Sequence, residues 1–283
     1  MPEVRVVVSN ELDRYMNTVV QKGMFGSKAE LIRAALIRYI ETLPIRVPSG
    51  YDDTNLFSPD GRIFQIEYAM ESPPRGVTIL GLRYKGGIIL AKERPQASQT
   101  EKHHTILTQP WETFQITDHI GMVPTGLSGD FLLLKHRAIH EAQTYQRETE
   151  TPIPVEELTN RLALFIHSYT TKKDIRPLGL LALIGGIDDT GLHLYVLDPS
   201  GTYREVLTWC EGTHRNETNT ILNEEYAPNH AFNKALALTI KSLLRDKTRT
   251  PDELNAAVIE TKTNTIRKIT TDEIKTTWTK AFS

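Results

Sequence analysis

The sequence has almost no cysteine and no strong excess of either charge. Cys210 is the single cysteine among 283 residues, so the chain cannot form an internal disulfide, and it fits a reducing compartment. Its 33 basic and 35 acidic residues give a net charge of −2. The chain therefore lacks the global basic excess that is typical of nucleic-acid-binding proteins.

Long hydrophobic runs are also missing. No apolar stretch approaches the roughly 18 residues of a membrane span. Glu3, Glu11 and Asp13 interrupt any apolar core that a signal peptide would need at the N-terminus. We therefore expect a soluble, cytoplasmic protein that makes no membrane contact.

The composition that remains is ordinary for a globular protein, with 39% hydrophobic and 24% charged residues. At about 150 residues per domain, the length allows one large and one small domain. The stretch PIRVPSG, residues 44–50, contains two prolines and a glycine and is typical of an extended linker. The sequence thus predicts a small domain over residues 1–43 and a large domain over residues 51–283.

The small domain has the pattern of one strand followed by two helices. Alternating residues over 4–8 predict the strand. A first helix begins near Glu11 and ends at the glycines of residues 23–26. Ser27 and Glu30 have the spacing of a capping box and open the second helix. A segment this short cannot bury a core alone, so its single strand should pair with that of another copy.

The stretch VRVVVSNELDRYMNTVVQKGMFGSKAELIRAALIRYIE resembles a ribbon-helix-helix module. The resemblance implies that two chains pair their strands and that outward side chains of the ribbon read the DNA major groove. The outward positions here are Glu3, Arg5 and Val7, and of these only Arg5 can donate to a guanine edge. Ser27 and Lys28 could hold a phosphate at the start of the second helix.

Charge argues for dimerisation over DNA binding in this module. Residues 1–43 carry six basic and five acidic side chains, a net charge of +1, which is a weak field for a phosphate backbone. Both readings stay open: a dimerisation module, or a DNA-binding transcriptional regulator that uses the large domain as an oligomerisation scaffold.

The large domain alternates pairs of strands with pairs of helices. Such an order predicts an α/β fold in which two sheets pack together with helices outside. The expected helices cover residues 60–71, 129–148, 154–171, 217–225 and 231–244 and a last helix from Thr271. The expected strands cover residues 77–83, 87–92, 113–116, 119–124, 178–185, 192–197, 203–208, 255–260 and 265–268.

The stretch YDDTNLFSPDGRIFQIEYAMES, followed by RGVTILGLRYKGGIILAKE, resembles the N-terminal signature of proteasome α-type subunits. The segments IRPLG, GGIDDTG and LDPSGTY, within residues 175–203, are similar to further motifs of that family. The resemblance covers residues 51–283. It implies a four-layer αββα sandwich of the N-terminal-nucleophile hydrolase type that assembles into rings.

The resemblance also implies that this chain is not an enzyme by itself. In the family, β-type subunits use a terminal threonine as nucleophile and base, tuned by a lysine. Here the threonine position is Val77 and the lysine position is Glu112. Thr78 lies one residue later, so its side chain should point to the opposite face of the strand.

Further positions carry over to a gate and to an activator pocket. Tyr51, Asp52, Pro59 and Tyr68 match residues that order the axial pore. In α-type subunits a lysine at the Glu112 position pairs with the C-terminal carboxylate of ring-shaped activators, so Glu112 should repel such a tail. We also expect residues 58–71 to make ring contacts.

The sequence therefore predicts a non-catalytic ring subunit. It would form the gated outer ring for separate threonine-protease β-type subunits, with the small module above the pore. A chamber without proteolysis is a third alternative. No cofactor is expected, and no metal, because His136 and His140 on one helix have no fixed third ligand. Family rings have seven subunits, so modules that pair in twos would pair between two rings, or the ring would not be heptameric.

Overall fold

The computed structural model describes residues 7–23, 25–42, 57–58, 61–94, 114–172, 174–245 and 249–281. The chain divides into two compact units, Met1–Gly50 and Tyr51–Ser283. Arg5, the linker over residues 44–50, Tyr51, Asp52, Pro59 and Glu112 lie outside the described residues. None of the helices that the structure describes is both long and apolar enough to span a bilayer.

The small unit contains two helices, α1 (Asn10–Gln21) and α2 (Lys28–Thr42). The Ser9 hydroxyl caps α1 by accepting the Leu12 amide at 3.3 Å. The predicted capping box of α2 is present in a shifted form. The Ser27 hydroxyl accepts the Glu30 amide at 3.2 Å, but the Glu30 carboxylate reaches one residue further back and accepts the Gly26 amide at 2.8 Å.

The predicted ribbon strand falls largely outside the described part of the small unit. Residues 1–6 are not described, and Val7 and Val8 have no regular secondary structure. The ribbon therefore stays a prediction. Among the described residues of this unit Met16 is the only buried hydrophobic side chain, as expected for a segment that lacks a core of its own.

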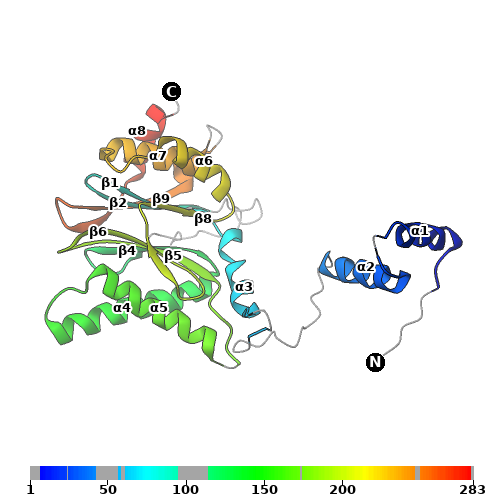
Figure 1. Ribbon diagram of the computed structural model, residues 1–283. Helices are drawn as coiled ribbons and strands as arrows, with labels where there is room; N and C mark the ends of the chain where they lie inside the picture. The colour runs from blue at the N-terminus through cyan, green and yellow to red at the C-terminus, as the bar shows by residue number, and fades with distance from the viewer. Residues whose placement is uncertain are drawn as a thin grey trace, which may run out of the picture. The chain divides into compact units, whose positions relative to one another are not determined.

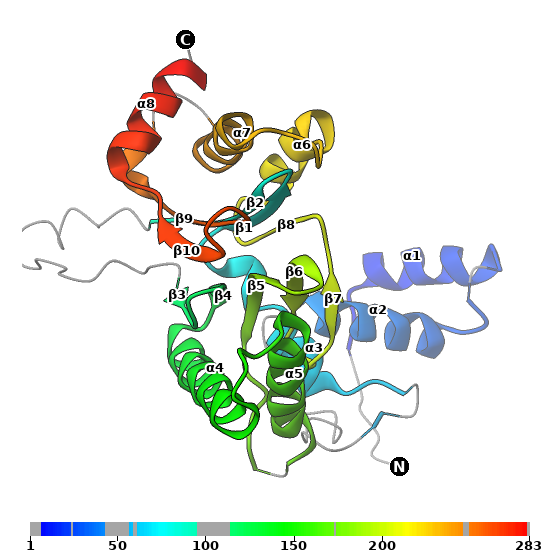
Figure 2. The same cartoon turned by 90° about the vertical axis from the view of Figure 1, so that its left-hand side faces the viewer.

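The large unit has four layers, and Figure 1 shows them from top to bottom as helices, sheet, sheet and helices. The first sheet has the strand order β10-β9-β2-β1-β8 and the second has the order β3-β4-β5-β6-β7, with all pairs antiparallel. Helices α6, α7 and α8 cover the first sheet, and α4 and α5 cover the second (Figures 1 and 2). This arrangement confirms the expected α/β sandwich.

The elements of the first sheet and its helices are β1 (Ile79–Tyr84), β2 (Gly87–Glu93), β8 (Thr208–Glu211), β9 (Leu254–Glu260), β10 (Thr265–Lys268), α6 (Arg215–Glu225), α7 (Phe232–Leu244) and α8 (Thr271–Ala281). Those of the second are β3 (Phe114–Gln115), β4 (Ile120–Gly126), β5 (Leu180–Asp188), β6 (Gly191–Leu197), β7 (Tyr203–Glu205), α4 (Ser128–Thr149) and α5 (Val155–Thr171). Helix α3 (Phe64–Met70) and the short 3-10 turns η1 (Pro73–Arg75) and η3 (Pro251–Glu253) complete the unit.

The single strand predicted over residues 203–208 is wrong. This segment forms β7 and then β8, which belong to different sheets. The Val206 amide still bonds to the Leu194 carbonyl in the second sheet, at 2.8 Å, whereas the Leu207 carbonyl accepts the Arg83 amide of the first sheet, at 2.9 Å. The chain thus crosses between the sheets at residues 206–207, and its alternating pattern hides the change of partner.

Apolar side chains fill all three spaces between the layers. Alternate residues of β1 and β2 face either the other sheet or the helices, because successive side chains of a strand point to opposite faces. Ile79, Ile88 and Leu90 pack between the sheets. Leu80 and Ile89 pack under α7. This alternation also positions the two charged residues that end β2.

Candidate functional site

Val77, two residues before β1, is the position at which the family resemblance places a catalytic threonine. Gly76 directly precedes it and has no room for a side chain. A Cβ atom there would lie 2.2 Å from the Thr125 hydroxyl and 2.5 Å from the Gly126 amide nitrogen. The Thr125 hydroxyl donates to the Val77 carbonyl at 2.7 Å, and the Thr213 hydroxyl donates to the Gly76 carbonyl at 2.8 Å. The backbone on both sides of this position is therefore tightly held.

Thr78 follows Val77 directly in the chain, and it is fully buried. Its oxygen accepts the His214 amide at 3.2 Å and lies 3.4 Å from Nδ1 of His214. The same Nδ1 lies 3.3 Å from the Glu93 carboxylate. A nucleophile–histidine–carboxylate relay needs both ring nitrogens, one for each partner. Because one nitrogen faces both groups here, the three residues stabilise the loop and do not activate Thr78.

Glu93 is the centre of a buried ionic cluster at the end of β2. The residue is 4% exposed, and its carboxylate contacts Nη1 of Arg245, Nη1 of Arg249 at 3.2 Å and Nδ1 of His214. A buried carboxylate is stable only when it is paired and hydrogen-bonded. The cluster ties β2 to the segment after α7 and to the turn before α6.

Lys92 points to the other face of β2, into the space between the sheets. Its ammonium donates to the Pro124 carbonyl at 2.9 Å. Burial lowers the pKa of Lys92 to about 8. Neither Lys92 nor Glu93 was among the residues predicted from the sequence, although the alternation along GIILAKE places one charge on each face of the strand.

Asp130 and Arg176 form a second fixed ion pair, near the start of α4. Both guanidinium Nη atoms of Arg176 contact the Asp130 carboxylate at 2.7 Å, and the Gly179 amide donates to it at 2.8 Å. Burial alone would raise the pKa of Asp130, but these hydrogen bonds outweigh it and hold the pKa below its usual range. Gly179 in turn lies against Ser72, so the pair supports the segment that leads into β1.

The predicted gate residues are only partly described. Tyr68 lies on α3, where its ring stacks on Phe64 with the ring centres 6.4 Å apart. Before α3, the Ser58 hydroxyl accepts the Arg62 amide at 3.0 Å. Tyr51, Asp52 and Pro59, together with the pocket position Glu112, belong to the parts that the structure does not describe.

The DNA-reading residues are also partly described. Val7 is 99% exposed. The Ser27 hydroxyl is occupied as the cap of α2. The Lys28 ammonium pairs with the Asp13 carboxylate at 2.6 Å, and this hydrogen bond lowers the pKa of Asp13. A phosphate at the start of α2 would therefore compete with Asp13 for Lys28.

Metal binding has no support among the described residues, in which no group of three histidine, cysteine or acidic side chains is placed to hold an ion. His136 and His140 are exposed on α4. Cys210 is buried, and burial raises the pKa of its thiol to about 12, which makes the thiol unreactive.

Comparisons with known proteins place this fold in a family. The family model for proteasome subunits matches residues 74–261, and the model for the N-terminal signature of A-type proteasome subunits matches residues 51–71. The chain is 34% identical over 230 residues to the proteasome alpha subunit of Methanocaldococcus jannaschii, covering 81% of this chain and 87% of that protein. It is 35% identical over 216 residues to the protein of the same name from Methanopyrus kandleri, covering 75% and 86%.

The chain therefore belongs to the proteasome subunit family, and its N-terminal signature is that of the α type. Within that family it stands with the non-catalytic ring subunits. Both matched ranges lie after residue 50, so the small unit has no part in this assignment.

Proposed function

We propose that this chain builds the gated outer ring of a proteasome-like particle and that separate β-type subunits cleave the substrate. The observation that carries the proposal is the held backbone at Gly76. The α-type segment, with α3 and η1, stays joined to β1 at the position where a catalytic subunit needs a free terminal threonine. Val77 supplies no nucleophile there, and Glu112 supplies no tuning cation.

Purification of the tagged chain from its native cells tests this proposal. We expect a β-type subunit to co-purify, identified by mass spectrometry, and peptide cleavage that a threonine-directed inhibitor abolishes. The chain produced alone serves as the control and should cleave nothing. Recovery of stable rings without any β-type subunit or peptidase activity would favour the non-proteolytic chamber instead.

For the small unit we propose pairing with a second copy above the pore. The supporting observation is a set of exposed apolar side chains on and before its two helices: Val7, Leu12, Tyr15, Leu36 and Tyr39. Tyr15 and Tyr39 are 68% and 63% exposed, so a partner that covers them would remove apolar surface from water. Because units that pair in twos do not fit a seven-membered ring, the pairs would join two rings face to face.

Electron microscopy of the purified rings tests the pairing. We expect face-to-face double rings, and we expect Tyr15→Glu to separate them while Lys22→Glu, at the C-cap of the same helix, leaves them joined. Single rings from the unchanged chain at all concentrations would contradict the proposal. The DNA-binding alternative requires a gel shift that Arg5→Ala abolishes. We do not favour the DNA-binding alternative, because Lys28 is already paired with Asp13 and a phosphate would have to compete for it.

For the activator pocket we propose a changed specificity. Glu112 replaces the family lysine, so ring-shaped activators that end in a free carboxylate should dock poorly. A partner that presents a cationic or amidated tail fits this position better.

A further inference from the structure

A cavity of about 410 Å³ lies at the end of the sandwich away from the start of β1. It is enclosed by the last turn of α4, the α4–α5 connection, the β5–β6 turn and Asn264 of the β9–β10 turn. Its walls are largely apolar and come from Tyr145, Pro152, Pro154 and Ile187. Two carboxylates, of Asp188 and Asp189, complete the lining.

The Asp188 carboxylate is ionised and fixed in place. One oxygen accepts the Val155 amide at the start of α5, at 2.9 Å, and the other accepts the Thr190 amide at 2.9 Å and the Thr190 hydroxyl at 2.6 Å. Burial alone would raise the pKa of Asp188, but these hydrogen bonds outweigh it and lower the pKa. His193 lies 3.5 Å from this carboxylate, outside the lining of the cavity. Asp189 is exposed beside it, so the cavity presents a second carboxylate to solvent.

No lysine or arginine is among the described lining residues, so the second carboxylate has no cation beside it in the cavity wall. His119, which also lines the cavity, uses Nδ1 with the Thr117 hydroxyl at 3.0 Å and Nε2 with the Ile153 carbonyl at 3.0 Å. Arg147 folds back onto its own helix α4, where Nη2 contacts the Thr144 hydroxyl at 3.1 Å. The exposed Asp189 carboxylate is therefore the group that a cationic ligand would meet.

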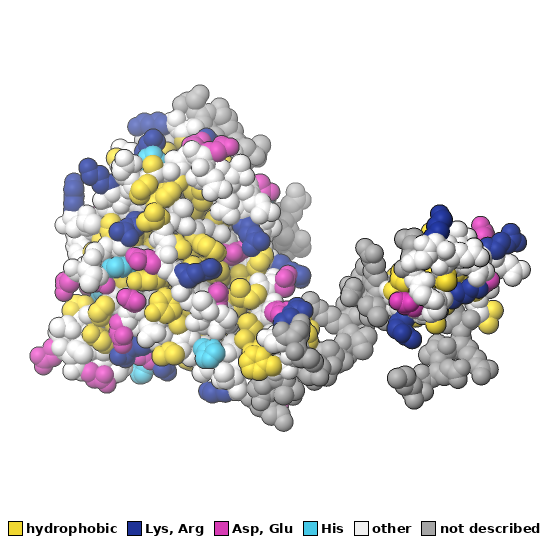
Figure 3. Space-filling model, viewed as in Figure 1, with side chains coloured by type: hydrophobic (Ala, Val, Ile, Leu, Met, Phe, Trp, Pro, Cys, Tyr) yellow, Lys and Arg dark blue, Asp and Glu magenta, His cyan; other side chains and the backbone are white. Residues whose placement is uncertain are grey.

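The surface around the cavity strengthens the negative field. Glu148, Glu150 and Glu156 are exposed on the α4–α5 connection and its ends. The carbonyl end of α4 adds its dipole to this charge. Figure 3 shows acidic side chains, with some basic ones beside them, at the lower left of the view, where Figure 1 places the end of α4 and the start of α5. A nucleic acid or an anionic membrane would be repelled here.

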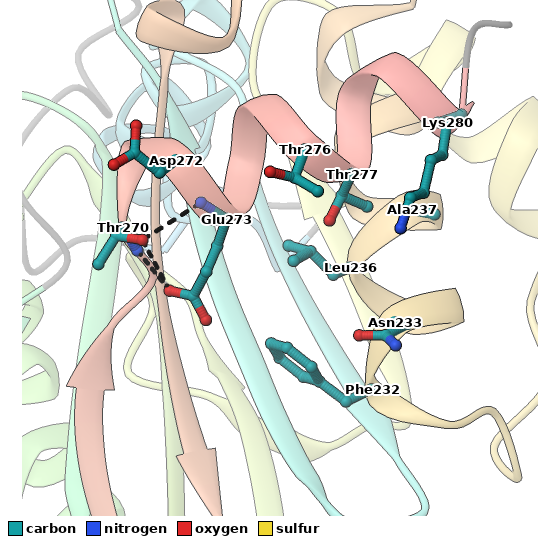
Figure 4. A pocket seen from close by; sticks show the side chains of 11 residues that line it. Phe232, Asn233, Leu236, Ala237, Thr270, Asp272, Glu273, Thr276, Thr277 and Lys280 are labelled. Atoms are coloured by element: carbon teal, nitrogen blue, oxygen red, sulfur yellow. Dashed lines mark hydrogen bonds between the residues drawn. The ribbon is translucent and has the colours of Figure 1, made fainter.

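The groove between α7 and α8 differs in this respect (Figure 4). Its volume is about 580 Å³, but its Glu273 carboxylate accepts the Thr270 amide at 2.8 Å and pairs with Arg267 at 3.1 Å. That carboxylate is used to hold the start of α8. The groove's other carboxylate, that of Asp272, is exposed, but Lys280 also lines the groove, whereas no lysine or arginine is among the described residues that line the cavity beside Asp188.

We propose that the cavity beside Asp188 and Asp189 binds an arginine side chain presented by a partner protein. The aliphatic stem of arginine packs along the proline and isoleucine walls, and its guanidinium reaches the exposed carboxylate of Asp189. The volume exceeds that of one side chain, so residues flanking the arginine fit within it as well. All the residues that line the cavity belong to the large unit.

Two peptides of identical sequence test this proposal on the full chain. One carries a single arginine among alanines and glycines, and the other carries citrulline, its neutral isostere, at the same position. Saturation-transfer NMR titrations measure both. We expect the arginine peptide to bind about tenfold more tightly than the citrulline peptide, because only the guanidinium makes a charge-assisted contact.

Asp189→Asn should weaken the arginine peptide about fivefold and leave the citrulline peptide unchanged. Glu224→Gln, which removes an exposed carboxylate from α6, is the matched control and should change neither. Equal binding of the two peptides, no saturable binding up to about 5 mM, or an unchanged affinity in Asp189→Asn would each overturn the proposal.

Discussion

Replacing Asp130 with asparagine tests how the segment in front of β1 is held. The carboxylate is 7% exposed and accepts three hydrogen bonds, two from Arg176 and one from the Gly179 amide. Asparagine keeps the shape of the side chain, but its NH₂ group would face one of the N–H donors of Arg176 or Gly179. Since the Arg176 side chain is 59% exposed, solvent screens the pair and we add no separate Coulomb contribution.

The expected loss follows from the hydrogen bonds. A hydrogen bond to a charged acceptor contributes about 1.5–3 kcal/mol, and we expect Asp130→Asn to lower the free energy of unfolding by about 2–3 kcal/mol. For a domain of this size that corresponds to a melting temperature lower by about 5–10 °C. Glu71→Gln is the control, because Glu71 and Arg75 are 4.0 Å apart and exposed, and it should cost less than about 0.5 kcal/mol.

The pH dependence gives a second check on the same pair. The pKa of Asp130 is lower in the folded state than in the unfolded chain, so its stabilisation is present above the unfolded value of about 3.9 and is lost as the pH falls through the folded value. Thermal melts of both chains at the same concentration should therefore converge toward acid pH. Two results would contradict this account: Asp130→Asn melting within about 1 °C of the unchanged chain at pH 7, or a deficit that is undiminished at about pH 3.

Three further changes test other parts of the site. Gly76→Val should cost more than about 3 kcal/mol, because its Cβ would meet backbone at Gly126, whereas Gly129→Ala, with open space around it, should be neutral or slightly stabilising in thermal melts. The pKa of Lys92 is about 8 in the folded state and higher in the unfolded chain, so the free energy of unfolding of the unchanged chain should rise between about pH 8 and pH 10. Lys92→Met should remove this rise, and a pH profile that stays the same in the variant would contradict the account. Glu112→Lys should increase the affinity for a carboxylate-ended activator peptide about tenfold over the unchanged chain in fluorescence polarisation, and equal affinities would remove the assignment of this position.

Most elements of the large unit could be predicted from the sequence because their periodicity is set by burial. Helix α5 was expected over residues 154–171 and is found at Val155–Thr171. The prediction of a single strand over residues 203–208 was wrong because alternation indicates which face of a strand is buried and not which sheet the strand belongs to. No local pattern marks the crossing at residues 206–207.

The ionic contacts of the site could not be predicted in the same way. Asp130 and Arg176 are 46 residues apart, and Glu93 and Arg245 are 152 residues apart. Only the fold brings such pairs together. The IRPLG motif supported only the family resemblance, and no local pattern indicates that Arg176 holds Asp130.

The two charged residues at the end of β2, Lys92 and Glu93, make structural contacts near the position that is catalytic in the enzymes of this fold. Lys92 faces the inter-sheet space and binds the Pro124 carbonyl, whereas Glu93 faces the opposite side and gathers Arg245, Arg249 and His214. An enzyme of this fold would need a free amine and an accessible hydroxyl at the adjacent start of β1. Here Lys92 bonds to a backbone carbonyl and Glu93 to three basic side chains. Thr78 is fully buried, and its hydroxyl accepts the His214 amide. The hydrogen bonds of Thr125 and Thr213 likewise hold the backbone in front of β1, and this is the segment for which we propose a gate.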